Sequence, residues 1–144
     1  MTNQEEPRLP GNIVFIQVPD HFRRHIGDFE VDPAIPIPVE LGQGIQDISS
    51  LTWEMLVAGM LRLLAHDPAN MAADYYRRFI RAVKPDIVTE LSSTGVMKAR
   101  NGDLDVAEEV FLALSGLDPE APEPILNLAI LNEDRADRLE SSGK

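Results

Sequence analysis

From Asp47 onward, apolar residues recur at helical spacing and are interrupted at intervals by proline, glycine and Asn-Gly signals. This pattern predicts about five helices. Their expected ranges are 50–66, 69–83, 86–100, 104–114 and 122–140. Ser49 or Ser50 is expected to cap the first helix, and proline is tolerated in the first turn of the fifth. The fourth helix is expected to stop near Gly116.

The first 48 residues follow a different pattern. Asn12–Val18 is short and β-branched, which predicts a strand or an extended segment. Asp20 is a candidate cap for a helical turn over residues 21–29. Prolines at positions 33, 36 and 38 exclude both helix and central strand from Val31–Leu41, yet this run is apolar. An unstructured linker would be polar, so we predict an extended arm that lies on the helical body.

A second periodicity, of thirty-four residues, runs through the helical part. The clearest copy is Glu90–Pro119, and weaker copies precede and follow it. The recurring sets are Val57, Leu91 and Ile125; Met60, Thr94 and Leu128; Leu61, Gly95 and Ala129; Ala73 and Ala107; Val83 and Leu117; Pro85 and Pro119. A repeated unit of this length suits two helices and their turns.

The clearest copy resembles the tetratricopeptide repeat family in its small, aromatic and proline positions. The matching residues are Leu91, Gly95, Gly102, Asp103, Ala107, Phe111, Leu117 and Pro119. The resemblance implies an all-α fold of helix-turn-helix repeats, stacked as a short right-handed α-solenoid of about five helices. An extended proline-rich arm, 1–48, would precede a repeat domain, 49–144. About two and a half repeats are expected, over 50–85, 86–119 and the incomplete 120–144. Because stacked repeats need about three units or a cap, we expect the array to continue beyond Lys144.

In this family the first helix of each repeat lines a concave groove that receives extended peptides. The resemblance therefore implies a groove formed by Met55, Arg62, Ser92, Ser93, Val96, Arg100, Asn127 and Ile130. The family's best-known clamp for peptide carboxylates uses lysine, asparagine and arginine, and only Asn127 fits it. We expect a protein-interaction scaffold that binds an apolar extended peptide, or its own arm through residues 31–41, because tethering raises the effective concentration.

Two other features allow alternative interpretations. The proline-spaced run could be a ligand for a domain that reads polyproline helices, although it has no flanking basic residue. The basic stripe Arg77, Arg78, Arg81 and Lys84 could bind an acidic partner. The favoured interpretation is a solvated helix face that pairs with Asp74 or Asp86.

The net charge of −11 is concentrated in residues 101–144, which carry eleven acidic and three basic side chains. Such a field repels nucleic acid phosphates and anionic lipid headgroups, so neither is an expected partner. The chain has no cysteine, which removes disulfides and thiolate metal sites. The first residues are acidic where a secretory signal would be basic, and a cytoplasmic protein is expected.

Catalysis is not expected, and neither is a cofactor. The strongest catalytic alternative is a small metal-dependent or regulatory domain that uses His21 and His25, which would share one face of a helix. Zinc normally requires a third protein ligand, and no companion motif is present. His66 is expected to interact with a helix end. The sequence contains no nucleophile-elbow pattern, and Gly42-Gln43-Gly44 is too short to cradle a phosphate.

Overall fold

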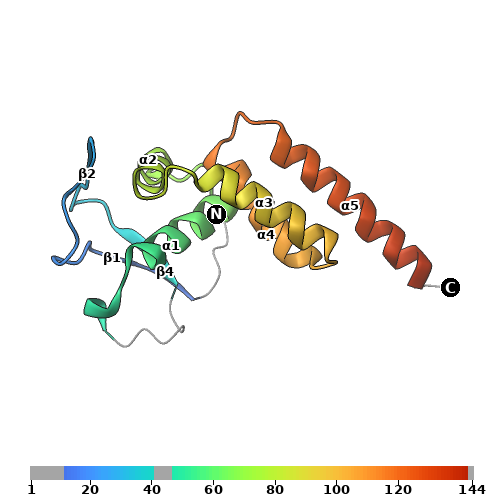
Figure 1. Ribbon diagram of the computed structural model, residues 1–144. Coiled ribbons are helices and arrows are strands. Elements are labelled where there is room, and N and C mark those ends of the chain that lie inside the picture. Colours follow the sequence, from blue (N-terminus) through green and yellow to red (C-terminus); the bar gives the residue numbers. More distant parts are fainter. Residues whose placement is uncertain (1–11, 41–46, 143–144) are drawn as a thin grey trace, which may run out of the picture.

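A computed structural model describes residues 12–40 and 47–142. Within these residues the protein is mostly helical, with five α-helices and two small antiparallel sheets (Figure 1). The strands are β1 (Ile13–Ile16), β2 (His25–Ile26), β3 (Phe29–Glu30) and β4 (Ile37–Glu40). The helices are α1 (Trp53–His66), α2 (Ala73–Val83), α3 (Ile87–Arg100), α4 (Leu104–Leu117) and α5 (Glu123–Ser142), and a short 3-10 turn, Ile48–Ser50, precedes α1. The sheets lie at one end of the molecule and α5 lies at the other (Figure 1).

The two sheets are formed by short strands within residues 12–40. The strand expected within residues 12–18 is confirmed as β1, which pairs antiparallel with β4 from Ile13–Glu40 to Ile16–Ile37. The helical turn expected over residues 21–29 is wrong, because this segment forms the β2–β3 hairpin. Gly27, with φ of 61°, allows the tight turn between the two strands.

The proline-spaced segment packs on α1 through β4. Val31, Ile37, Pro38 and Val39 are buried, whereas Ala34 is exposed and Leu41 lies outside the described residues. Gly59 of α1 makes this contact possible, because a Cβ atom at this position would lie 2.0 Å from the Pro38 carbonyl oxygen. The backbone of β4 therefore lies directly against the helix.

Most helix boundaries differ from the expected ones by only a few residues. The first helix is capped by Thr52, whose Oγ1 accepts a hydrogen bond from Met55 N at 3.3 Å, and not by Ser49 or Ser50. Those serines lie in the 3-10 turn capped by Asp47, and their hydrogen bonds to Asp47 lower the pKa of its carboxyl group, the Ser49 side chain most. The second helix starts at Ala73, because Asn70 accepts a hydrogen bond from Ala72 N and forms a turn before it.

The buried apolar side chains form two clusters. The first joins the sheets, α1 and α2, and contains residues from both sides of the expected division at residue 48. The second lies between α3, α4 and α5, and its buried members are Ala107, Phe111, Leu114 and Leu131. Helix α4 connects the two, since it packs extensively on α1 as well as on α3 and α5.

The fourth helix was expected to stop near Gly116, and α4 ends one residue later, at Leu117. Gly116 lies where α4 crosses α1, and a Cβ atom there would lie 2.0 Å from the Leu64 carbonyl oxygen. The glycine is required by close helix packing and not by a turn. Gly95 of α3 also lies at a close approach, with the Phe111 ring in the space that a Cβ atom would need.

Stability is expected to fall at high pH because of Tyr76, which is buried and donates a hydrogen bond to the Pro36 carbonyl at 2.6 Å. Burial, and then the neighbouring Tyr75, raise the pKa of Tyr76 to about 12. The tyrosine in the unfolded chain ionises first, near pH 10, so its contribution is present below about pH 10 and is lost as the pH rises toward about 12. We expect urea unfolding to show a loss of about 2 kcal/mol over this interval. Tyr76→Phe should lose clearly less, and equal losses in the two proteins would contradict this account.

Candidate functional site

Two adjacent hollows lie along α3. The first has a volume of about 360 Å³ and is formed by side chains of α3 and α5 above Phe111 of α4. It is lined by Val96, Ala99, Arg100, Phe111, Asn127, Ile130, Leu131, Glu133, Asp134 and Asp137. The second is lined by Ser92, Ser93, Val96, Met97, Arg100 and Asn101. Val96 and Arg100 line both, so we treat the two hollows as one surface and call it the α3–α5 groove.

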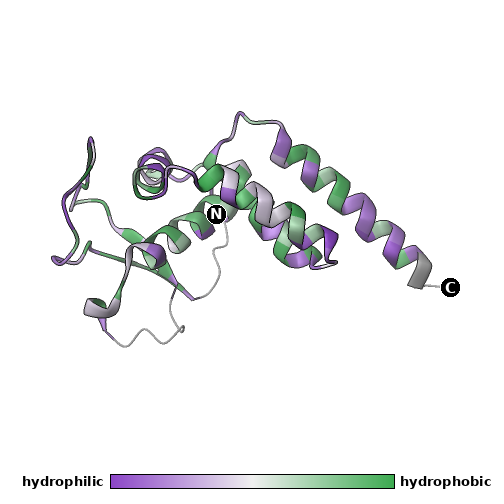
Figure 2. Cartoon of the chain, viewed as in Figure 1, coloured by the Kyte–Doolittle hydropathy of each residue, from purple (hydrophilic) through white to green (hydrophobic). Residues whose placement is uncertain are grey.

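The groove has an apolar floor and charged margins. Phe111 and Leu131 are buried beneath it, whereas Ile130 remains 63% exposed and Val96 38% exposed. Figure 2 shows that apolar residues concentrate in the first half of α5 and polar residues in the second half. An apolar side chain of a ligand could bury itself on this floor, with polar groups around it, as is typical of ligand pockets.

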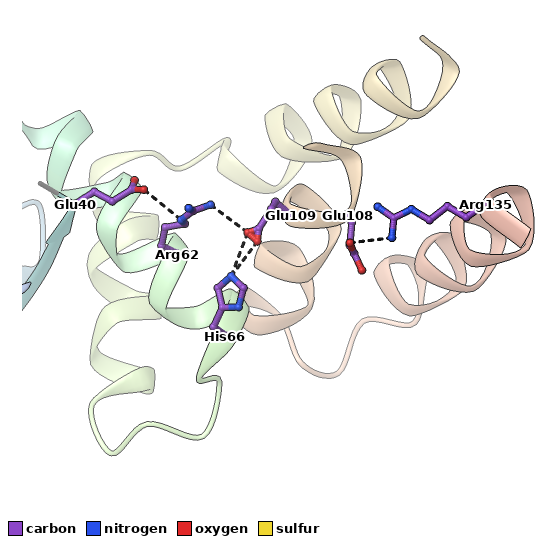
Figure 3. Close-up of polar contacts among 6 residues, drawn as sticks. All are labelled: Glu40, Arg62, His66, Glu108, Glu109 and Arg135. Atoms are coloured by element: carbon purple, nitrogen blue, oxygen red, sulfur yellow. Dashed lines mark hydrogen bonds and ion pairs between the residues drawn. The ribbon is translucent and has the colours of Figure 1, made fainter. Parts of the chain in front are cut away.

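Helix α5 is fixed on α4 by one arginine. Arg135 donates to Asp105 Oδ1 at 2.6 Å and to Glu108 Oε1 at 3.1 Å, and the pair with Glu108 is drawn in Figure 3. The apolar contacts of Leu128 and Leu131 with the second cluster lie on the same helix. Together these contacts hold α5 beside α3 and so position the walls of the groove.

Six of the eight groove residues expected from the sequence line this surface: Ser92, Ser93, Val96, Arg100, Asn127 and Ile130. The other two, Met55 and Arg62, lie on α1 and line neither hollow. Met55 packs against the first apolar cluster. Arg62 belongs to a chain of ionic contacts on the other side of α4 (Figure 3).

This chain of contacts joins β4, α1 and α4. Arg62 Nη1 donates to Glu109 Oε1 at 3.1 Å, and its Nε lies 3.3 Å from Glu40 Oε2 without hydrogen-bond geometry. The His66 ring nitrogen Nε2 lies 2.9 Å from Glu109 Oε2. His66 therefore contacts a carboxylate of α4 in addition to lying in the last turn of α1. These groups are about one-third exposed, so the contacts align α1 on α4 more than they stabilise the fold.

The basic stripe of α2 is mainly structural. Arg77 Nε donates to the Gly116 carbonyl at 2.8 Å, and Arg81 Nη2 donates to the Leu117 carbonyl at 3.4 Å. These carbonyls end α4 and have no partner within the helix, so the two arginines satisfy its C-terminus. Arg77 and Arg78 also lie 3.9 Å from Asp74, the partner expected from helical spacing.

His21 and His25 do not share a helix face, because the segment between them is not helical. His21 Nε2 lies 3.2 Å from the Leu51 carbonyl oxygen, and its ring packs on Phe22. His25 lies in β2. Within residues 12–40 and 47–142, no group of three or more potential ligands is placed to hold a metal ion.

Sequence reasoning missed Phe111 as the floor of the groove and Asp137 as part of its wall. In the sequence, Phe111 stands out only as one of the residues that match the repeat. Asp137 follows Glu133 by one helical turn, so their spacing was the available signal for an acidic wall.

None of the helices in the described residues is both long and apolar enough to span a membrane.

Comparisons of the chain with protein-family models, with curated proteins and with solved structures found no match. The resemblance to tetratricopeptide repeats therefore depends on the residues of the repeat itself.

Proposed function

We propose that this chain is a protein-interaction module, related to tetratricopeptide repeats, that binds a peptide segment of a partner protein in the α3–α5 groove. The observation that carries the proposal is the convergence of six expected groove residues from two helices on one surface with an apolar floor. The positions follow from the repeat pattern of the sequence, which is independent of the hollows. In this proposal, α3–α4 is one repeat and α5 is the first helix of the next.

The first repeat takes a different part in this proposal. The positions on α1 that would extend the groove are used by contacts within the chain: β4 covers Gly59, and Arg62 and His66 contact Glu109 of α4. The chain's own extended segment thus occupies the face of α1 and leaves the α3–α5 groove for a partner. We do not propose a metal-dependent domain, because that interpretation requires His21 and His25 on one face of a helix, and residues 21–25 are not helical.

Replacing Val96 with glutamine is expected to weaken partner binding about tenfold, because Val96 lines both hollows and a buried apolar contact contributes on the order of 1 kcal/mol or more. The measurement is affinity capture with the full chain from the native cell, followed by titration of each retained protein. Val106→Gln on α4 is the matched control, because Val106 is 46% exposed and lines neither hollow. Equal binding by the two variants would contradict the proposal.

A further inference from the structure

We infer that the segment recognised by the α3–α5 groove is cationic as well as apolar: a lysine or arginine next to an aliphatic or aromatic residue. This inference rests on the proposed function and names the chemistry of its ligand. It starts from the side chains around the first hollow, where three carboxylates on α5 stand against one guanidinium on α3. These are Glu133, Asp134 and Asp137, and the guanidinium is Arg100.

The carboxylates are only partly neutralised within the protein. Asp134 forms an ion pair with Arg138 at 3.5 Å. Within the described residues, Glu133 and Asp137 form no ion pair, although they follow each other by one helical turn on α5. Like charges at this spacing destabilise a helix, and a bound cation would relieve their repulsion. Arg100 does not relieve it, since it also forms no ion pair within the described part of the chain.

An apolar floor lies directly beside these charges. Ile130 is one turn before Asp134 on α5, and both line the same hollow with Val96 and Phe111. A ligand that inserts an apolar side chain between α3 and α5 therefore places its neighbouring residue at the acidic wall. The apolar residue and the neighbouring cationic residue together, and not the positive charge alone, define the ligand.

The charge of the chain favours this occupant over two others. A second copy would bring another net charge of −11 toward an acidic wall, which opposes self-association through this face. The chain's own segment 31–40 contains two acidic residues and no basic residue, and it lies on α1. A cationic partner is instead attracted by the field of residues 101–144, which strengthens binding at low salt.

Selection of random short peptides, displayed on phage, against the full chain tests the inference. Peptides whose binding is weakened by Val96→Gln should be enriched in lysine or arginine next to an apolar residue. Their affinity should fall about tenfold in the variant Glu133→Gln, Asp134→Asn, Asp137→Asn. Their affinity for the wild type should also fall when salt is added. The control variant Asp20→Asn, Asp28→Asn, Glu30→Gln makes the same change in net charge at exposed residues outside the groove and should bind as the wild type does.

The alternative outcomes separate the two proposals. One outcome would overturn the cationic ligand and leave the groove as a binding site. In that outcome, the peptides that depend on Val96 are acidic or uncharged, and they bind the wild type and the variant without the three carboxylates equally well. Self-association that Val96→Gln abolishes, or selection only of sequences like residues 31–41, would also overturn it. If no peptide depends on Val96, both the ligand and the proposed function are overturned.

Discussion

Replacing Gly116 with alanine is expected to lower the free energy of unfolding by about 3 kcal/mol, the upper part of the usual range for overpacking. A Cβ atom at this position would lie 2.0 Å from the Leu64 carbonyl oxygen, which belongs to the backbone of α1 and cannot rotate away. The two helices would have to separate, and this would loosen the contacts of Leu64, Leu117 and the ionic chain through Glu109.

The direction in which Gly116→Ala changes the free energy of unfolding is the informative result. In an ordinary helix, glycine to alanine stabilises by about 1 kcal/mol through helix propensity. Urea unfolding of the purified variant measures the difference. A stabilised Gly116→Ala protein would contradict the packing of α4 on α1. Ser115→Ala provides a control on the same turn of α4, where the side chain is only half-buried, and its effect should stay within about 0.5 kcal/mol.

Ile37→Ala is expected to cost about 3 kcal/mol, because the Ile37 side chain is fully buried between β4 and the helices. The physical reason is the loss of apolar burial together with the cavity left behind. A loss of this size would mean that residues 31–40 are part of the core and not a dispensable arm.

Phe15→Ala is the matched control for Ile37→Ala. Phe15 lies on β1, the partner strand in the same sheet, and pairs with Pro38, the next residue after Ile37. Its side chain is larger but 45% exposed, so its removal should cost less than about 1 kcal/mol. If thermal or urea unfolding gave the reverse order, β4 would not pack on α1 as described.

The helices were predictable because their signals are local. Asp67-Pro68, Lys84-Pro85 and Asn101-Gly102 mark chain breaks by their own backbone preferences, and apolar spacing marks the faces between them. The β2–β3 hairpin was missed, since strands of two residues carry no measurable alternation. The helix that would bring His21 and His25 onto one face does not form.

The packing of α1 on α4 could not be predicted from these local signals. It depends on contacts between residues far apart in sequence, such as Arg62 with Glu109 and Gly116 with Leu64. Six of the positions that the repeat pattern selects lie on α3 and α5 and line the two hollows. Met55 and Arg62, which the same pattern selects, lie on α1, and α1 contacts β4 and α4 and not the groove.

The proposed function is tested most directly by amide hydrogen exchange of the full chain with and without a peptide that binds it. The account predicts slower exchange on binding in two separate segments, residues 92–101 of α3 and the following turn and residues 127–137 of α5, which contain most of the groove lining. Exchange in α1 and α2 should change little. Slower exchange confined to residues 13–40 or to α1 and α2, with no change along α3 and α5, would contradict it.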